Sequence, residues 1–355
     1  MSATAIQAIT PALFTNHRQL LRNPTLRFHS LATPIQRRCR YCAARVSRQN
    51  PPVPTSTTDD RLSCLNMWWR LLSRLISLYL LSLNLVASAS DYSSPSSYLC
   101  EDISYYYSPV KHLRGETLKK KLNSIIYPHY SLSYNKVWDA LKILDAADID
   151  NPEDSSAIVE IYSLRVVPKE LSGKPLGWNR EHLWPRSYGL TYGPSLTDLH
   201  NIRPADVNVN SSRGNKYYGE CNTSLTRCLR PANKEAALDT ETDKERWAPP
   251  MQVRGDIARA LMYMAVCYGF QQPGGSPGLR LSDTPNVEKR EMGLLSTLLK
   301  WNEIDPPSRE EKLRNERICK SYQHNRNPFV DHPEYANLIW KEVVSRRSPQ
   351  DNGLS

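Results

Sequence analysis

Apolar and polar positions follow helical or strand periods over much of the chain beyond residue 110. Residues 113–126 carry apolar side chains at 118, 122, 125 and 126, and residues 134–147 gather theirs on one side of a helical wheel. Both patterns predict amphipathic helices. Residues 158–162 are mostly β-branched and bounded by turn residues, which predicts a strand, and a turn-rich segment, 168–177, follows.

Three more helices are predicted after residue 250. The first, 256–268, directs five side chains inward: Ile257, Leu261, Met264, Ala265 and Tyr268. Residues 287–301 and 309–322 follow the same period, and the charges crowded into 309–322 predict a solvated face with Leu313 and Ile318 inward. Gly and Pro in 271–278 predict an exposed loop.

The polar stretch 178–215 does not suit a packed core. Its 38 residues include two histidines, four arginines and five asparagines, with Glu181 directly before His182. Such side chains transfer protons, bind metals and hold phosphates. The stretch therefore indicates an enzyme that cuts or transfers a group.

His182 is the candidate general base, because an unperturbed imidazole titrates closest to neutrality. Arg180 lies two positions earlier, and on an extended segment residues two apart share a face. Its guanidinium is suited to hold a phosphate where an activated water attacks it. Glu181 would face the other way on a regular strand, so both side chains meet only if the strand ends, twists or bulges; Pro185 favours an ending.

Glu181 and Asn210 supply hard oxygen donors of the kind that Mg²⁺ selects. Such sites use one or two protein ligands, with waters and substrate phosphate completing an octahedron. We therefore predict a phosphodiesterase site with one Mg²⁺, for which other divalent cations substitute. Arg213 is a second candidate for the scissile phosphate, and Arg203 is a weaker one.

Five ordered motifs between Cys100 and Trp340 resemble the endonuclease I group of non-specific nucleases, in the ββα-metal (His-Me finger) superfamily. They are Glu181-His182, Asp198-Leu-His-Asn201, Val209-Asn-Ser-Ser-Arg-Gly-Asn215, Arg254-Gly-Asp-Ile-Ala-Arg-Ala-Leu-Met-Tyr-Met264 and Asn325-Arg-Asn-Pro-Phe-Val-Asp-His-Pro-Glu-Tyr335. A Glu-His pair alone is a weak signal, but the ordered set is specific.

The resemblance implies an α+β fold in which a ββα-metal core, a two-stranded finger plus a helix, is embedded in a mostly helical single domain. A strand carrying His182, a returning strand and a helix carrying Asn210 would form that core. His182 matches the general base, Glu181 and Asn210 the metal ligands, and Asn201 an asparagine that helps orient the site. One departure is His324, where the family pattern has glycine before Asn-Arg-Asn-Pro.

The net charge of +10 does not by itself indicate a nucleic-acid partner. Residues 1–89 hold 11 arginines, no lysine and two acids, so residues 90–355 carry 35 basic and 34 acidic side chains. A local excess remains around the motif, where residues 165–230 hold 10 basic and 5 acidic groups. This patch suits a polyanion, although a mixed solvated surface looks similar.

The first 89 residues predict targeting signals. Residues 1–66 resemble an organelle transit peptide or a disordered leader, and 67–89 resemble a signal peptide with cleavage near Ala89. The apolar run is too short for a confident membrane span, so the mature form is predicted to lack a membrane anchor. Secretion, with Met67 as an alternative start, is the preferred interpretation; import into a plastid through a bipartite leader is the alternative. A linker, 90–109, the nuclease domain, 110–340, and a tail, 341–355, follow.

Five cysteines follow the leader, at 100, 221, 228, 267 and 319. Cys221 and Cys228 are the predicted disulfide, because a local pair is the easiest to form in an exported protein. A zinc site is the rival, with spacing unlike Cys-x2-Cys.

The leading hypothesis is thus a metal-dependent endonuclease acting on DNA, with RNA as a second candidate substrate and little sequence preference. The alternative is a catalytically silent nucleic-acid-binding protein on the same fold. A buried structural His182 and a metallohydrolase with other substrates are further rivals.

Overall fold

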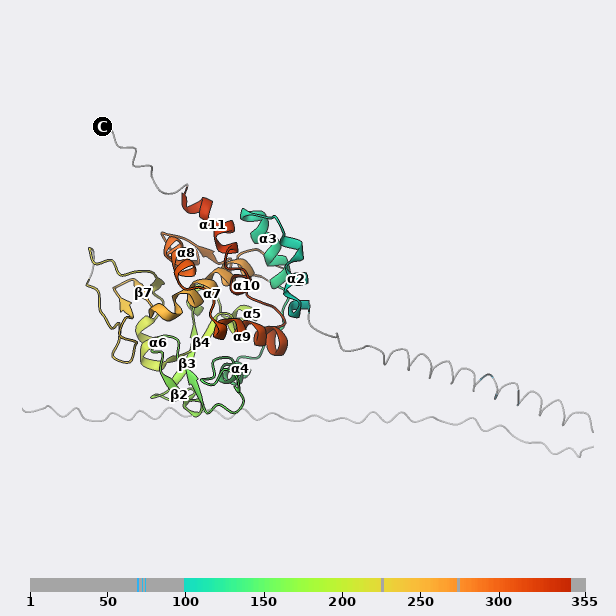
Figure 1. Ribbon diagram of the computed structural model, residues 1–355, viewed down its shortest axis with the longest axis horizontal. Coiled ribbons are helices and arrows are strands. Elements are labelled where there is room, and N and C mark those ends of the chain that lie inside the picture. The colour runs from blue at the N-terminus through green and yellow to red at the C-terminus, as the bar shows by residue number, and fades with distance from the viewer. Residues whose placement is uncertain are drawn as a thin grey trace, which may run out of the picture. The chain divides into compact units, whose positions relative to one another are not determined.

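The computed structural model describes residues 99–345, except 225, 226, 273 and 274, together with the separate residues Trp69, Leu72 and Arg74. Apart from those three positions, the predicted leader and signal-like segment lie outside the described residues. Helices and small sheets alternate in an α+β arrangement (Figure 1). Over the described ranges, no helix has both the length and the apolar character needed to span a bilayer.

Short helical turns begin the described chain. They are η1 (Leu99–Glu101), α2 (Ile103–Tyr106) and η2 (Ser108–Val110), and two longer helices follow, α3 (Gly115–Ile126) and α4 (Lys136–Leu144). The helices predicted at 113–126 and 134–147 are therefore confirmed. Each buries one apolar face, as the periodicity predicts, with Leu118 and Leu122 inside on α3 and Val137 and Leu141 on α4.

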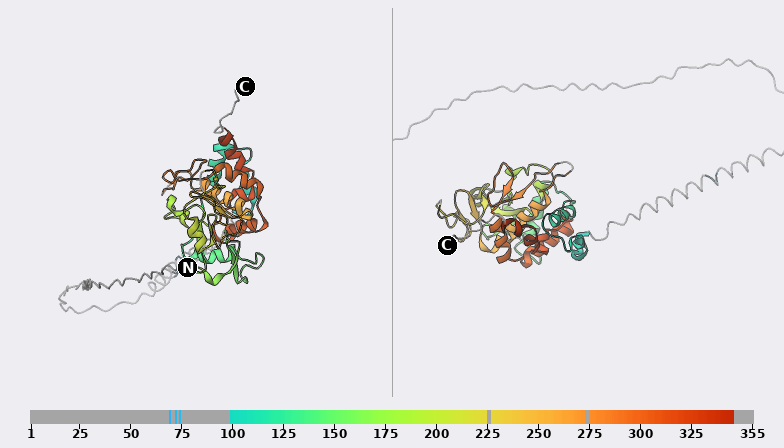
Figure 2. Two further views of the ribbon diagram at one scale, coloured as in Figure 1. Left: turned by 90° about the vertical axis from the view of Figure 1, so that its left-hand side faces the viewer. Right: turned by 90° about the horizontal axis from the view of Figure 1, so that it is seen from above.

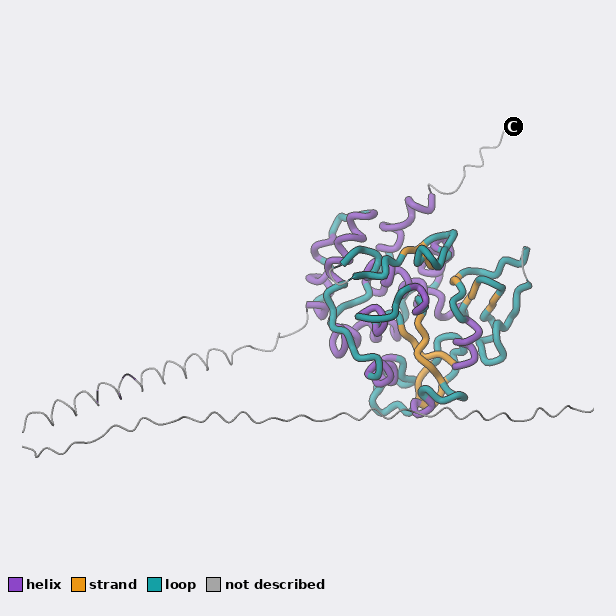
Figure 3. The backbone as a smooth tube through the Cα atoms, turned by 180° about the vertical axis from the view of Figure 1, so that it is seen from behind, coloured by secondary structure: helices purple, strands orange, loops and turns teal. Residues whose placement is uncertain are grey.

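Two antiparallel strands and a helix lie next to one another in the middle of the sequence. Strand β3 (Trp178–His182) pairs with β4 (Ile202–Asp206), and α6 (Val207–Arg213) starts directly after β4. Asp206 makes this junction possible, because its Oδ1 accepts hydrogen bonds from the amides of Asn208 and Val209 at 2.8 and 3.1 Å and caps the helix. Figure 3 shows the strand pair among the surrounding helices.

The connection between β3 and β4 contains η4 (Arg186–Tyr188) and the four-residue helix α5 (Pro194–Thr197). The other sheets are small. They are β1 (Ala157–Val159) with β2 (Val166–Pro168), the three-stranded sheet of β5 (Tyr217–Tyr218), β7 (Arg246–Ala248) and β6 (Glu241–Thr242), and β8 (Arg280–Leu281) with β9 (Glu291–Met292).

Helix α7 (Arg254–Cys267) is central to the core, because every side chain from Ile257 to Cys267 is buried. It packs against α3, α8 (Leu295–Ile304) and α10 (Pro328–Asp331). All five side chains predicted to face inward are buried. The last helix, α11 (Tyr335–Ser345), lies beside α3 (Figure 2). Two further 3-10 turns are η3 (Lys169–Leu171) and η5 (Met251–Val253).

Two predicted elements have wrong boundaries. The strand predicted at 158–162 ends at Val159, and the chain then turns so that Tyr162 is buried. The helix predicted at 287–301 begins only at Leu295, because Glu291 and Met292 pair with β8. Gly293 brings the backbone close to that strand: an added Cβ would lie 2.0 Å from the carbonyl oxygen of Ser282.

The solvated face predicted for 309–322 is also partly wrong. This segment forms α9 (Arg309–Arg317) and a π-helical turn, η6 (Ile318–Gln323), yet Glu311 and Arg314 are buried. Glu311 accepts hydrogen bonds from Arg259 at 2.8 Å, and Arg314 pairs with Asp145 at 3.1 Å. Partners from distant segments neutralise charges that the local pattern assigns to solvent.

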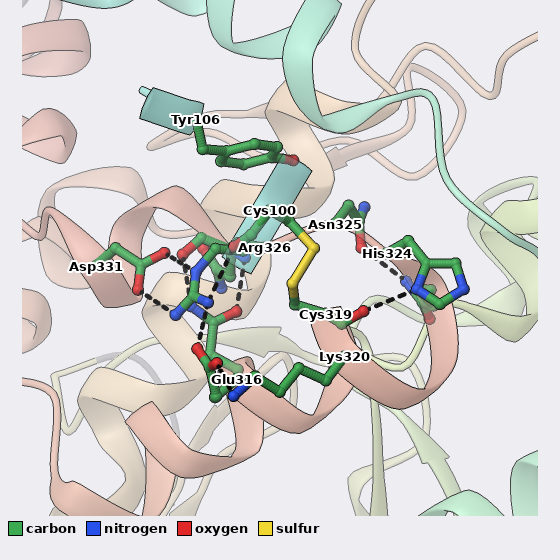
Figure 4. Close-up of a disulfide and its surroundings, with 12 residues drawn as sticks. Cys100, Tyr106, Glu316, Cys319, Lys320, His324, Asn325, Arg326 and Asp331 are labelled. Atoms are coloured by element: carbon green, nitrogen blue, oxygen red, sulfur yellow. Dashed lines mark hydrogen bonds and ion pairs between the residues drawn. A yellow bond between two sulfur atoms is a disulfide. The ribbon is translucent and has the colours of Figure 1, made fainter. Parts of the chain in front are cut away.

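The structure contains the predicted disulfide between Cys221 and Cys228, so these sulfurs offer no thiolates to zinc. A second disulfide joins Cys100 to Cys319 across 219 positions (Figure 4). Cys267 is a free thiol buried in the core.

His324, beside this second disulfide, keeps the backbone shape that a glycine would adopt. Its φ and ψ are 61° and 30°, in the left-handed region, and its Nδ1 lies 2.8 Å from the carbonyl oxygen of Cys319. This left-handed conformation is one that glycine adopts without strain, so the turn itself is compatible with either residue.

Candidate active site

Arg180, Glu181 and His182 are the last three residues of β3. The strand ends at His182, as the sequence predicts. Glu181 and His182 are both buried, with exposed fractions of 3% and 6%. Their side chains have different neighbours: that of Glu181 meets Tyr162 and Arg213, whereas that of His182 meets the loop containing α5.

The His182 ring has backbone partners at Leu196 and Arg180. Its Nε2 lies 2.9 Å from the carbonyl oxygen of Leu196 in α5. A carbonyl oxygen only accepts, so Nε2 carries the proton in this contact and Nδ1 holds the lone pair of the neutral ring. Burial lowers the pKa of His182 to about 4, assisted by the charges of Arg186 and Arg180 and opposed by the backbone contacts with Leu196 and Arg180. The imidazole is therefore an unprotonated base at neutral pH.

The guanidinium of Arg180 lies over two aromatic rings. Its central carbon lies 3.6 Å from the ring centroid of Tyr134 and 4.2 Å from that of Trp138. Nη1 donates to the carbonyl oxygen of Tyr134 at 2.6 Å. The ring of His182 lies over the same tyrosine, 6.1 Å between centroids, which confirms that Arg180 and His182 share a side of β3. Arg186 lies 5.7 Å from that ring and adds a second cation.

Glu181 is held through one of its two oxygens. Oε1 accepts hydrogen bonds from the hydroxyl of Tyr162 at 2.7 Å and from Nη1 of Arg213 at 2.9 Å. Burial raises the pKa of the Glu181 carboxyl, and Arg213 and Tyr162 oppose that rise. The backbone amide of His182 also stabilises the ionised carboxyl. Both side-chain hydrogen bonds that this carboxylate accepts within the described residues go to Oε1, and neither goes to Oε2.

Asn210 lies on α6, three residues before Arg213, so both project from the same side of the helix. Its side-chain amide makes no hydrogen bond to any residue in the described ranges. Carboxylate and amide oxygens are hard donors of the kind that Mg²⁺ prefers, so Glu181 and Asn210 are the residues of this site that could hold a cation.

Arg213 and Arg203, both predicted to bind phosphate, are engaged inside the protein. Arg213 is 1% exposed; besides Glu181, it donates to the carbonyl oxygens of His182 at 3.0 Å and Leu183 at 2.6 Å. Arg203 forms ion pairs with Asp145 and Asp256, at 2.7 and 3.3 Å. These contacts assign both arginines to the framework around the site.

Asn201 also belongs to the framework. It is fully buried, its Oδ1 accepts from the amide of Trp184 at 2.7 Å, and its Nδ2 donates to the carbonyl oxygen of the same residue at 3.2 Å. Its side chain therefore fixes the backbone two residues beyond His182.

Sequence reasoning missed four participants: the ring of Tyr134, the hydroxyl of Tyr162, the hydroxyl of Tyr218, which lies 2.5 Å from that of Tyr162, and the carbonyl group of Leu196. Tyr134 and Tyr162 fall inside predicted core elements, where a buried aromatic is ordinary, and Tyr218 lies just beyond the polar stretch 178–215. The Leu196 contact uses a backbone atom, which leaves no mark in the sequence. Tyr134 starts the predicted helix 134–147, and nothing in the neighbouring sequence marks it as part of the site.

Comparisons with known proteins show the family. The sequence profile of the family described as Endonuclease I matches residues 114–334, more than half of the chain. An extracellular ribonuclease of Bacillus amyloliquefaciens is 42% identical over 244 residues, covering 67% of this chain and 79% of the relative. An extracellular ribonuclease of Bacillus subtilis (strain 168) is 40% identical, covering 73% and 83%. A periplasmic deoxyribonuclease of Aeromonas hydrophila is 31% identical over 38% of this chain and 47% of the relative.

These matches define a hydrolytic nuclease that acts on nucleic acid. The chain belongs to the endonuclease I family.

Proposed function

We propose that this protein is a Mg²⁺-dependent endonuclease that hydrolyses phosphodiester bonds of DNA and RNA with little sequence preference. The observation that carries the proposal is the state of His182, a neutral base with its Nε2 hydrogen bonded to Leu196 and its lone pair on Nδ1. A guanidinium, that of Arg180, is fixed on the same side of the strand.

In this proposal β3, β4 and α6 form the ββα-metal core, with Glu181 and Asn210 as the metal ligands. The strand order, the direct β4 to α6 junction and the free amide of Asn210 support the assignment. A bound Mg²⁺ would neutralise charge on the scissile phosphate and on the leaving 3′ oxygen.

The protein groups then have distinct roles. Nδ1 of His182 accepts a proton from a water molecule as its oxygen attacks phosphorus, and the bond from phosphorus to the 3′ oxygen breaks. Arg180 holds the phosphate, because its position over two rings is set before substrate arrives. We propose Arg186 as the second phosphate-binding cation in place of Arg213, which is buried. Asn201 keeps the backbone after His182 in position.

A nicking assay on supercoiled plasmid, with and without EDTA, tests the activity. His182→Ala should abolish cleavage while leaving DNA affinity within a few-fold, since removing a positioned base costs roughly a hundred- to ten-thousand-fold in rate. His332→Ala is the matched control, because that histidine pairs with Glu334 at the surface. Cleavage by His182→Ala at a tenth of the parent rate or faster would overturn the assignment. Full activity in EDTA would exclude the metal.

The same assay separates an enzyme from a silent nucleic-acid binder, which would retain DNA without nicking it. Asn210→Ala should weaken the response to added Mg²⁺, with Asn208→Ala, exposed on the same helix, as its control. Overlapping Mg²⁺ titrations for Asn210→Ala and the parent would place the metal elsewhere.

Both DNA and RNA are proposed substrates, because the proposed contacts reach phosphate, which the two share. The names of the relatives also divide between ribonuclease and deoxyribonuclease. Parallel digestion of plasmid and of a long single-stranded RNA tests this. Cleavage of only one of them would require a contact to the sugar that the proposal lacks.

We also propose that the protein is secreted after cleavage near Ala89, which the extracellular and periplasmic names of its relatives support. Sequencing the N-terminus of native protein tests this, with a start near Ser90 expected. Mass spectrometry adds a check, because Asn210 and Asn222 both lie in glycosylation sequons. A glycan on Asn210 of active material would remove that residue from the metal site.

A further inference from the structure

Tyr218, Tyr162 and Glu181 form a buried chain of hydrogen bonds in which each hydroxyl donates toward the Glu181 carboxylate. The hydroxyl of Tyr162 has a single proton and donates it to Oε1 of Glu181. Its second contact, with the hydroxyl of Tyr218 at 2.5 Å, must therefore be one in which Tyr218 donates. A tyrosine hydroxyl ordinarily keeps its proton at neutral pH, so both protons are present.

Arg213, on the helix that carries Asn210, is the second residue that binds the Glu181 carboxylate. Its guanidinium lies 4.6 Å from the ring centroid of Tyr218 and donates to Oε1 of Glu181. It also donates to the last backbone carbonyl of β3 and the one after it, those of His182 and Leu183. Arg213 thus ties the strand that carries one proposed metal ligand to the helix that carries the other.

Together these contacts saturate one oxygen of Glu181. A carboxylate oxygen accepts about two hydrogen bonds, and Oε1 receives one from Tyr162 and one from Arg213. We infer that Tyr162, Tyr218 and Arg213 are positioning residues that leave only Oε2 to bind the metal, and so select a small octahedral cation. The inference rests on the proposed function for the identity of the metal ligands.

The chemistry of the two common cations gives this arrangement a consequence. Mg²⁺ demands near-octahedral geometry and takes one oxygen from a carboxylate, whereas the larger Ca²⁺ accepts both oxygens of one carboxylate. A site that blocks Oε1 favours Mg²⁺. Releasing Oε1 should let Glu181 bind through two oxygens and reduce the discrimination against Ca²⁺.

Tyr162→Phe is the decisive variant, because it removes one hydroxyl and keeps the ring packed against Trp247. Mg²⁺ and Ca²⁺ are each titrated by calorimetry into the metal-free full chain. The dissociation constant for Mg²⁺ should rise about tenfold, within the range known for groups that orient metal ligands. That for Ca²⁺ should change by less than about threefold. Tyr218→Phe should shift both dissociation constants in the same direction as Tyr162→Phe does, but by smaller factors.

Tyr217→Phe is the matched control, since Tyr217 precedes Tyr218 on β5 and faces the other side of the strand. Its metal affinities should equal those of the parent. Unchanged Mg²⁺ affinity in Tyr162→Phe would overturn the inference, and so would an equal loss for both metals, because Oε1 would then play no part in selection. Thermal unfolding in EDTA verifies that each variant is folded.

Arg213→Lys is a second test, because lysine keeps the charge but loses the planar fork. We expect weaker Mg²⁺ binding, whereas parent-like affinity would remove Arg213 from the network. Glu181→Gln separates this inference from the proposed function. If Glu181→Gln binds Mg²⁺ as the parent does, the proposed metal site is wrong; if it does not, the Tyr162→Phe result tests the inference alone.

Discussion

The pH dependence of cleavage should show the unusual protonation of His182. Burial lowers the pKa of this imidazole to about 4 from its ordinary value of 6.5, and the nearby Arg186 and Arg180 charges act in the same direction. The base works only when neutral, so activity is lost as pH falls through the folded pKa. At pH 5.5 a histidine of pKa near 4 is about 97% neutral, whereas an ordinary one is roughly 9% neutral.

The assay is kcat/KM for plasmid nicking between pH 4 and 8, because that ratio reports groups of the free enzyme. We expect a nearly constant rate from pH 7 to pH 5.5 and a decline of about tenfold per unit below pH 4. Protonation of Glu181, whose pKa is also raised by burial, would add an acid-side loss. Mg²⁺ competes with that proton, so the profile is measured at saturating Mg²⁺, where the Glu181 contribution moves to lower pH.

A variant makes the test sharper. Arg186→Gln removes a cation that disfavours the imidazolium, so it should raise the pKa of His182 and move the acid limb upward. Arg230→Gln, an exposed change at a residue that is not among the groups acting on His182, should leave the limb in place. A limb centred near pH 6.5 in the parent at saturating Mg²⁺ would refute the reasoning, because a base shielded by burial cannot titrate there.

Three other predictions follow from particular contacts. Arg180→Ala should reduce the slope of log affinity for DNA against log salt concentration by roughly one. Arg213→Lys should leave this slope unchanged, because Arg213 is buried. Equal slopes for the parent and Arg180→Ala would remove Arg180 from the phosphate contacts. Replacing both Cys100 and Cys319 by serine should lower the unfolding free energy in urea by up to about 5 kcal/mol, because this disulfide closes a loop of 219 positions. Removing the Cys221–Cys228 disulfide, which spans 7 positions, should lower it by roughly 2 kcal/mol. Equal losses from the two disulfides would contradict the loop argument. Arg314→Met should lower the unfolding free energy by about 3 kcal/mol, because the buried carboxylate of Asp145 and the carbonyl groups of Leu199 and Ile202 each lose a donor. A loss below about 1 kcal/mol would show that neighbouring groups replace the guanidinium.

Much of the fold and of the candidate site was predictable because the signal is local. A helix such as α3 repeats its apolar positions within four residues, and the helix predicted at 113–126 differs from α3 by only two positions at its start. The same holds for Glu181 and His182, whose adjacency and strand ending depend on the few residues up to Pro185. The Cys221–Cys228 disulfide was predictable for the same reason, because its partners are 7 positions apart.

The tertiary structure alone decided which charged groups are free to act. Arg213 and Arg180 are indistinguishable as basic residues of one polar stretch, yet one is 1% exposed and bound to Glu181 while the other is stacked at the edge of the site. Their environments come from Tyr162 and Tyr134, 51 and 46 positions away. Burial and hydrogen bonding depend on partners brought together by the whole chain, whereas periodicity depends only on neighbours. The sequence by itself therefore determined the chemistry present along β3 and α6, and only the packing around them determined which groups hold the framework and which remain available to a metal, a water and a phosphate.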